Sequence, residues 1–436
     1  MSATVAVLGD TLCGWIAAAM LSARLPRDAY RVVVVPGDRG GDGLGDFAPV
    51  ILVPPSSTGL HAELGFDPGG AVVLGTAFSG WRADGQDAFL SFGERGAPLE
   101  GVSFRQLAGR LRAMGRTVRL ADHSPAALAA QVGRDPAGAV PFAQCVETES
   151  YARQMREAAL RAGVLQLPAC TGMEVEPDGV IASLSLADGG AVDQPLLVLD
   201  CTGEHRDAAW EDWSRDFAAD RCGTGIAAMP AAPFAHLAAQ DSGWQTHWPV
   251  PGGVATLTFG TDGHGERFYS GRAGSAWRGN RIALGAAACV LPPVQPVALE
   301  LLLRALIRVI DLFPATSRAE VEAAAFNRAT RDEQACARDL LMAPFVATGR
   351  SAGLPSPALA AKLALYESCG RVPLLDGDLA DEDDWAMLFD AMGIVPRRYD
   401  ALADGLPVER IEAHLAAVRA QAIAAVRAMP PARVAA

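Results

Sequence analysis

Residues 4–15, TVAVLGDTLCGW, decide the fold of this chain. Val5–Leu8 is a short apolar run that predicts a strand, Gly9 predicts a tight turn, and the alanine-rich run Gly14–Arg24 predicts a helix. A strand, a glycine turn and a helix N-terminus together form a pyrophosphate site, because backbone N–H groups and the helix dipole point at the anion. The stretch therefore predicts either a dinucleotide-binding unit or an ordinary βα unit of an open sheet.

Two positions depart from the dinucleotide fingerprint, which asks for glycine at three places. Gly9 and Gly14 are the first and third, but Thr11 occupies the second, where a phosphate normally approaches the backbone closely. The fingerprint also wants an acid after the second strand to hold the ribose hydroxyls. Pro36 stands there, and Asp38 is the nearest substitute.

Composition limits the class of protein. The chain has 436 residues, of which 50% are hydrophobic, so it can bury the core of one large unit or two interlocked domains. The net charge is −13 and no basic stripe alternates with aromatics, which makes nucleic acid and anionic membranes poor partners. The eight cysteines show no CxxC pair, which favours reduced thiols over a disulfide framework or a metal site.

The termini and the apolar segments indicate a soluble, cytoplasmic chain. Met1–Val7 carries no basic segment ahead of an apolar stretch, so we predict no signal peptide. The most apolar segment, Ala298–Leu312, is interrupted by charges and is too short to span a bilayer. Oligomeric state cannot be predicted from these features.

Periodicity predicts the other elements. Gly85 lies in a polar turn between two strand-like runs, which predicts a hairpin. The predicted strands are 30–35, 72–81, 88–92, 196–199, 254–259 and 282–284. The predicted helices are 61–67, 104–114, 125–132, 150–162, 298–312 and 408–429, with a mostly helical region from 317 onward.

Five segments, in order, resemble the flavin-dependent tryptophan halogenase family over essentially the whole chain. Their order and spacing carry the resemblance more than any single string does. The segments are the turn from Gly9 to Trp15; Gly43-Leu-Gly45-Asp46 with Leu64–Asp67; Leu74–Trp81; Asp200–Gly203 with Trp210–Trp213; and Gly271–Gly285 with the helix that leads to Pro314.

The resemblance implies an α/β, Rossmann-like flavin module of the monooxygenase type with a largely helical substrate and C-terminal region. It divides the chain into residues 1–315, which bind FAD and contain an inserted β region for substrate, and a helical region 316–436. It implies that reduced FAD, supplied with electrons by a separate reductase, reacts with oxygen and halide to give hypohalous acid. A lysine then hands that acid to an indole with a glutamate's help.

The resemblance also implies which residues bind cofactor and substrate. The implied cofactor-binding residues are Gly9, Thr11, Gly14, Trp15, Asp38, Gly45, Asp46, Gly203 and Gly285. The implied substrate-binding residues are Trp81, Trp244 and Trp248. For the tryptophans, core packing is the alternative interpretation, and Asp46 could instead cap a turn.

The chemical residues of the family are replaced here. Counting back from Trp81, the lysine position holds Val73, and no lysine lies between residues 48 and 101. The glutamate position falls most closely on Gln295, which cannot act as a base. Pro296 then takes a place where a halide-binding backbone N–H is expected, and proline has none. The family's tryptophan motif keeps Trp244, but Thr246 stands in place of its second tryptophan.

Several single residues have two interpretations. His247 could carry a proton or be structural. Asp200 is expected to form a loop rather than to touch cofactor, and Trp210 and Trp213 are expected to pack. Cys201 and Cys289 are expected to be buried and inert.

Three functions remain open on the sequence: a flavin-dependent oxygenase or oxidase that acts on an aromatic or other small molecule, a non-catalytic binding or partner protein with the same fold, and a halogenase with relocated residues. A purified protein that is yellow favours the first. We predict that the chain does not halogenate free tryptophan.

Overall fold

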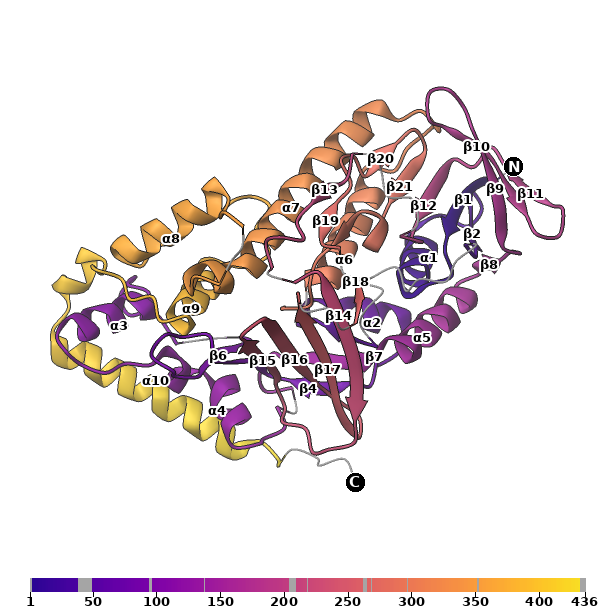
Figure 1. Ribbon diagram of the computed structural model, residues 1–436. Helices are drawn as coiled ribbons and strands as arrows, with labels where there is room; N and C mark the ends of the chain where they lie inside the picture. Colours follow the sequence, from indigo (N-terminus) through magenta and orange to yellow (C-terminus); the bar gives the residue numbers. More distant parts are fainter. Residues whose placement is uncertain are drawn as a thin grey trace. The chain divides into compact units, whose positions relative to one another are not determined.

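The computed structural model describes residues 2–37, 49–93, 96–136, 138–203, 209–217, 219–261, 265–267, 269–295, 297–350 and 353–431 (Figure 1). The chain forms two compact units, each built from three separate segments. Unit 1 comprises Met1–Gly69, Val146–Ser214 and Phe268–Ala335. Unit 2 comprises Gly70–Cys145, Arg215–Arg267 and Cys336–Ala436. The boundary predicted at residue 315 stays a prediction.

Unit 1 is organised around a six-stranded sheet of order β20-β21-β12-β1-β2-β8. All its neighbours pair in parallel except β20 and β21, and Val5 lies between Val32 and Leu197 in the register. The strands are β1 (Ala3–Leu8), β2 (Tyr30–Val35), β8 (Leu165–Gln166), β12 (Leu197–Asp200), β20 (Trp277–Arg278) and β21 (Arg281–Ala283).

Alternate side chains of this sheet enter two cores, because successive strand residues point to opposite faces. Val5 and Val7 pack with the helices α1 (Leu12–Arg24), α5 (Thr148–Arg161) and α6 (Val297–Asp311). Ala6 and Leu8 pack on the other face against an antiparallel sheet. Its strands are β9 (Cys170–Val175), β10 (Ile181–Leu186) and β11 (Ala191–Asp193). Unit 1 therefore has three layers, with α1 and α5 side by side on one of them (Figure 1).

Smaller elements complete unit 1. Three short strands, β13 (Glu211–Asp212), β19 (Gly271–Arg272) and β22 (Cys289–Val290), form a further sheet. The rest are β3 (Val50–Val53), the 3₁₀ turns η1 (Pro55–Ser57) and η3 (Gly285–Ala287), and α2 (Thr58–Leu64). Helix α7 (Glu320–Ala347) contributes its residues up to Ala335 to this unit.

Unit 2 contains a seven-stranded sheet of order β18-β14-β17-β16-β15-β5-β6. The strands are β5 (Gly75–Ser79), β6 (Ala88–Ser91), β14 (Arg221–Ala227), β15 (Ala235–Gln240), β16 (Gly243–Val250), β17 (Gly253–Gly260) and β18 (Glu266–Arg267). A separate strand, β4 (Ala71–Val73), pairs with the first residues of β7 (Ala143–Glu147). The remaining elements are α3 (Phe104–Ala113), η2 (Leu120–His123), α4 (Pro125–Gln131), α8 (Pro357–Cys369), α9 (Glu382–Ala391), η4 (Ala401–Gly405) and α10 (Val408–Ala428).

Most sequence predictions of the elements are confirmed. Tyr30–Val35 is a strand over its predicted range, and β5 and β6 form the predicted hairpin, with Phe78 opposite Ala88. The single strand predicted over 72–81 is wrong, because the structure has two strands, β4 and β5, that are interrupted at Leu74. The Leu74 N–H donates to the Pro233 carbonyl at 2.8 Å and so leaves the β4 ladder. The helix predicted over 61–67 ends earlier, at Gly65, whose φ of +73° stops it.

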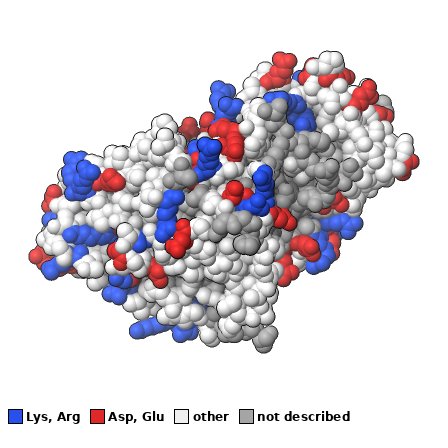
Figure 2. All heavy atoms as spheres, in the orientation of Figure 1, with Lys and Arg blue, Asp and Glu red and all other residues white. Residues whose placement is uncertain are grey.

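No helix within the described residues is long and apolar enough to cross a membrane. Figure 2 shows acidic and basic side chains interspersed over the face in view, with no large area of one sign there.

Candidate cofactor site

Two glycines, Gly9 and Gly14, shape the turn between β1 and α1. Gly9 has φ +104°, a region that favours glycine, and its N–H donates to the Val35 carbonyl at 2.8 Å. A Cβ on Gly14 would lie 2.0 Å from the Gly9 carbonyl oxygen, which is far below van der Waals contact. Gly9 is therefore favoured by its positive φ, and Gly14 is required by the close approach of the helix to the turn.

Thr11 at the second fingerprint position caps the helix. Its Oγ1 accepts from the Gly14 N–H at 3.2 Å and donates to the Cys201 carbonyl at 3.3 Å. The side chain is 9% exposed. The Thr11 hydroxyl is therefore directed into the protein, where it caps the helix, although threonine departs from the glycine that the fingerprint expects.

The N-terminus of α1 has backbone donors without intrahelical partners. The first amide that bonds a helix carbonyl is that of Trp15, which donates to the Thr11 carbonyl at 2.9 Å. The amides of Leu12 and Cys13 precede it and lack an intrahelical acceptor. Trp15 itself is 2% exposed, with the Arg156 guanidinium 5.6 Å from its ring centre, so its indole packs in the core of unit 1.

The end of β12 supplies a second glycine-containing turn. Gly203 has φ +72°, and a Cβ there would lie 3.3 Å from the Ala286 Cβ in η3. Gly285 begins η3 with φ +55°, and the preceding Leu284 N–H donates to the Asp200 carbonyl at 2.9 Å. The turns after β1, β12 and β21 thus meet at the carboxyl edge of the parallel sheet, where open α/β proteins bind nucleotides.

Asp200 holds this turn together. Its carboxylate is fully buried, and one oxygen accepts from the Thr202 N–H at 3.0 Å and the Thr202 hydroxyl at 2.7 Å. The other oxygen accepts from Arg281, whose Nε lies 3.0 Å away. Asp200 is therefore a loop-forming residue, as predicted. The sequence did not identify Arg281 as its partner, because 81 residues separate the two.

Three implied cofactor residues, Asp38, Gly45 and Asp46, lie outside the described residues. The structure brings Gly9, Thr11 and Gly14 together with Gly203 and Gly285 at one edge.

Cys13 and Cys201 near this edge are buried, and Cys289 is half-buried. Burial raises the pKa of the Cys201 thiol well above its usual range, and the neighbouring Cys13 thiol adds to the rise. Burial also raises the pKa of Cys289 to about 12. Both thiols that the sequence singled out are therefore protonated at neutral pH, and the protonated thiol is the unreactive form.

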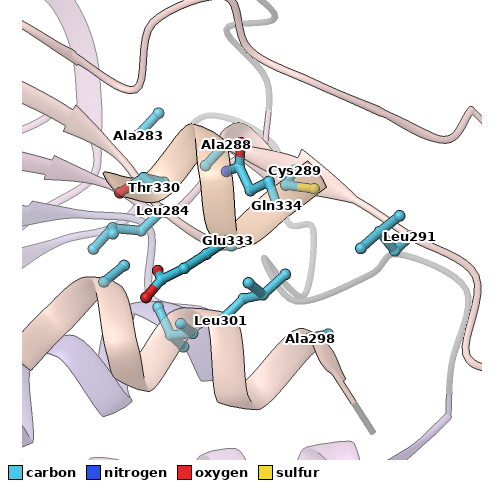
Figure 3. Close-up of a pocket in the computed structure, with 13 residues that line it drawn as sticks. Ala283, Leu284, Ala288, Cys289, Leu291, Ala298, Leu301, Thr330, Glu333 and Gln334 are labelled. Atoms are coloured by element: carbon cyan, nitrogen blue, oxygen red, sulfur yellow. The ribbon is translucent and has the colours of Figure 1, made fainter. Parts of the chain in front are cut away.

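A narrow cavity borders η3 between α6 and α7 (Figure 3). Its volume is about 30 Å³, room for a water or two, and Ala283, Ala288 and Leu301 form much of its wall. Glu333 enters it from α7, and its carboxylate accepts from Arg308 at 2.7 and 3.0 Å. The carboxylate is thus neutralised, and the space is too small for an aromatic substrate.

The resemblance assigns the family's lysine and glutamate positions to Val73 and Gln295, and this assignment stays a prediction. Val73 is fully buried at the end of β4, opposite Ala143 of β7. The Gln295 Nε2 is buried and has no hydrogen-bond partner within the described residues. Pro296 lies outside them.

Lys362 is the only lysine in the sequence. It lies on α8 in unit 2 and is 1% exposed. Its Nζ donates to the Asp378 carboxylate and to the Pro373 carbonyl, both at 2.6 Å, and lies 4.9 Å from the Trp385 ring centre. Two of the three N–H donors of the ammonium are therefore directed at the protein. A count along the whole sequence would have shown that Lys362 is the only lysine, but not that it is buried.

The three tryptophans implied in substrate binding are 1–4% exposed. The Trp81 Nε1 donates to the Leu237 carbonyl and the Trp244 Nε1 to the Phe217 carbonyl, each at 3.1 Å. Trp244 also stacks on Phe259 with ring centres 4.0 Å apart. These contacts describe core packing of unit 2, and the substrate role of Trp81, Trp244 and Trp248 stays a prediction.

Trp213 also packs, as predicted. It is 3% exposed, its Nε1 donates to Glu211 at 2.9 Å, and the Arg272 guanidinium lies 5.1 Å from its ring centre. Trp210 lies against Gly271, where a Cβ would be 2.3 Å from the Trp210 Nε1.

The three-layer unit with glycine turns at its carboxyl edge defines an α/β protein of the dinucleotide-binding type. The model of the family described as tryptophan halogenase matches residues 4–260 and 254–408. The chain belongs to the tryptophan halogenase family.

Solved structures share this fold. A flavin-dependent halogenase from Xanthomonas campestris is 24% identical, with a TM-score of 0.87 over 99% of this chain and 97% of that one. A flavin-dependent halogenase from Brevundimonas sp. BAL3 is 22% identical, with a TM-score of 0.88 over 99% and 98%. A thermophilic tryptophan halogenase from Streptomycin violaceusniger is 17% identical, with a TM-score of 0.86 over 99% of each chain. No curated protein matches the chain.

Proposed function

We propose that this chain is a flavoprotein that binds FAD at the carboxyl edge of the unit 1 sheet and acts as a flavin-dependent oxidoreductase of the monooxygenase class. Its substrate is an aromatic or other small molecule, and free tryptophan is not halogenated. Family membership supports the cofactor, and the arrangement of Gly9, Gly14 and Gly203 supports the place.

The residues of this edge fit a pyrophosphate. The amides at the start of α1 that lack an intrahelical acceptor, together with the positive end of the helix dipole, favour an anion by about 0.3–1 kcal/mol for each well-placed contact. The Thr11 hydroxyl accepts from the Gly14 N–H and donates to the Cys201 carbonyl, so it is directed into the protein and not toward the proposed pyrophosphate. In the proposal Asp38, Gly45 and Asp46 complete the site.

FAD, when bound and reduced, supplies electrons to oxygen. Oxygenation then needs a dry pocket and a fixed substrate more than an ionised side chain, and an apolar Val73 is compatible with that requirement. A separate flavin reductase in the cytoplasm is the proposed source of electrons, as in the mechanism that the family resemblance implies.

Halogenation of an indole needs more. Hypohalous acid must be held by an amine or a strong donor, or it diffuses away, and a carboxylate must stabilise the cationic arene. One well-placed electrostatic group is typically worth ~10²–10³-fold in rate. Val73 and Gln295 supply neither group. Arginine stays protonated, so it is a poor substitute for a lysine amine.

The observation that carries the proposal is the placement of Lys362. The chain has no other lysine, and this one is buried against Asp378 and Pro373. A relocated lysine therefore cannot replace the one missing at position 73, which argues against a halogenase with moved residues.

The test is incubation of the pure protein with a flavin reductase, FAD, oxygen, bromide or chloride, and tryptophan. We expect flavin turnover and peroxide without halotryptophan. Regioselective halotryptophan that accumulates through many turnovers would overturn the proposal.

The second candidate function is a binding or partner protein that has kept the fold and lost the chemistry. Pro36 favours it, because this residue stands where the dinucleotide fingerprint has an acid that holds the ribose hydroxyls of the cofactor. Titration with oxidised and reduced FAD separates the two candidates. A colourless protein without measurable affinity for either form supports the second.

A further inference from the structure

One face of the seven-stranded sheet in unit 2 carries a row of polar side chains. His236 on β15 is directly opposite His247 on β16, and β15 pairs on its other side with β5, which carries Ser79. The neighbours of His247 along β16, Thr246 and Trp248, point to the opposite, buried face. The topology therefore places two imidazoles side by side on adjacent strands.

The contacts within the row are short and specific. The rings of His236 and His247 stack with centres 5.5 Å apart and planes 20° from parallel. The His236 Nε2 and the Ser79 Oγ are hydrogen-bonded at 2.7 Å. The His247 Nδ1 is buried and has no hydrogen-bond partner within the described part of the chain.

The other described histidines are used differently. His61 bonds the Tyr151 hydroxyl at 2.8 Å, His123 bonds the Arg119 carbonyl at 3.0 Å, and His414 bonds the Ala97 carbonyl at 2.8 Å. His236 and His247 are half-buried, so solvent reaches part of each residue. In the pair of His236 and His247, the His247 Nδ1 has no hydrogen-bond partner within the described residues.

We propose that His236 and His247 together bind one divalent transition-metal ion, copper(II) most tightly, and that Ser79 orients His236 for it. Imidazole nitrogen is a preferred ligand of copper, nickel and zinc, and copper(II) is the strongest of these for a given site. Metal–nitrogen bonds are about 2.0–2.1 Å and ring lone pairs lie in the ring planes, so the nearly parallel rings must rotate, and the buried His247 Nδ1 must become accessible, for both to hold one ion.

The hydrogen bond to Ser79 supports this role. When the His236 Nε2–H donates to the Ser79 Oγ, the lone pair on Nδ1 is free for a metal, and the ring is held in one orientation. Burial and the neighbouring His236 lower the pKa of His247, so the neutral form that ligates metals predominates at neutral pH.

The site would be open. No group of three or more histidine, cysteine or acidic side chains gathers around a common point in the described ranges, so water or a small ligand would complete the coordination. The inference is independent of the proposed flavin function, because all its residues belong to unit 2 and the proposed cofactor residues described above belong to unit 1.

The experiment uses the untagged full chain and copper(II) chloride in a non-coordinating buffer at neutral pH. Isothermal titration is expected to give one ion per chain, and electron paramagnetic resonance is expected to show two imidazole nitrogens on the copper. The spectrum is measured on the parent protein, so it does not depend on whether any variant folds. A spectrum without two imidazole nitrogens overturns the proposal.

Variants then assign the nitrogens. His236→Gln and His247→Gln should each weaken copper binding at least tenfold, and Ser79→Ala should weaken it about tenfold, as loss of a hydrogen bond to a ligand typically does. His414→Gln, which removes a half-buried histidine elsewhere in the same unit, should leave the affinity unchanged. Circular dichroism checks that each variant is folded. Equal affinity in the parent and both histidine variants also overturns the proposal.

Discussion

The Lys362 ammonium lies 2.6 Å from the Asp378 carboxylate, and both side chains are almost fully buried. A buried ion pair contributes little net stability compared with apolar residues, but loss of one partner leaves a charge that neither water nor a counter-ion neutralises. The pair therefore fixes the position of the only lysine of the chain.

Lys362→Met is predicted to lower the free energy of unfolding by about 3–5 kcal/mol, because the Asp378 carboxylate loses its partner. The matched control is Arg116→Met, which breaks the exposed pair of Arg116 and Glu412 and should cost less than about 1 kcal/mol. Urea unfolding of both variants measures the difference. Similar decreases in the free energy of unfolding for the two variants would show that burial of the Lys362–Asp378 pair does not raise the cost of breaking it.

Val73→Lys is predicted to destabilise the protein rather than to restore a lysine for chemistry. Val73 is fully buried opposite Ala143, and the residues paired between β4 and β7, Ala71–Val73 with Ala143–Cys145, include no acidic side chain to receive an ammonium. An unpaired buried charge costs about 3–5 kcal/mol. Val72→Lys, on the half-exposed side of the same strand, is the control and should cost clearly less in urea unfolding. A Val73→Lys protein as stable as the control would show that position 73 is open to water.

The sequence predicted those parts of the fold that depend on local pattern. Tyr30–Val35 is an apolar run that ends at a proline, and the structure has a strand with those bounds. The hairpin around Gly85 follows from a polar turn between two alternating runs, and β5 and β6 pair as expected.

Pairings between distant residues could not be predicted in this way. The break at Leu74 depends on a hydrogen bond to Pro233, and the buried Asp200 depends on Arg281. His247 looked solitary in the sequence, and only the register of β15 and β16 places His236 beside it. Thr11 looked like a defect of the fingerprint because a spacing rule cannot show that its hydroxyl caps a helix.

Gly14→Val is predicted to weaken FAD binding. The new side chain would start 2.0 Å from the Gly9 carbonyl oxygen and force α1 away from the turn. Overpacking of this kind costs about 1–3 kcal/mol, and 1.4 kcal/mol corresponds to about tenfold in affinity. Fluorescence titration with FAD measures the effect. Gly59→Val in α2, where a Cβ would meet nothing within 4 Å, is the control. Unchanged affinity in a folded Gly14→Val protein would place the cofactor elsewhere.

His61 is predicted to make the protein less stable at mildly acidic pH. Burial lowers its pKa from the usual 6.5, although Asp67 partly opposes the shift, and its Nε2 bonds the Tyr151 hydroxyl at 2.8 Å. Because the folded-state pKa is the lower one, the unfolded chain binds the proton more readily, so stability is complete above about pH 6.5 and falls as pH decreases through the folded-state pKa.

Urea midpoints at about pH 7.5 and about pH 5.5, on either side of the ordinary histidine pKa, measure this dependence. His61→Gln removes the titrating group and should reduce the loss of stability between the two conditions. His123 and His247 also have lowered pKa values through burial, so part of the loss should remain. His414→Gln, in which a half-buried histidine outside this contact is changed, is the matched control. If His61→Gln and His414→Gln lose as much stability as the parent on acidification, His61 is not held neutral by the fold.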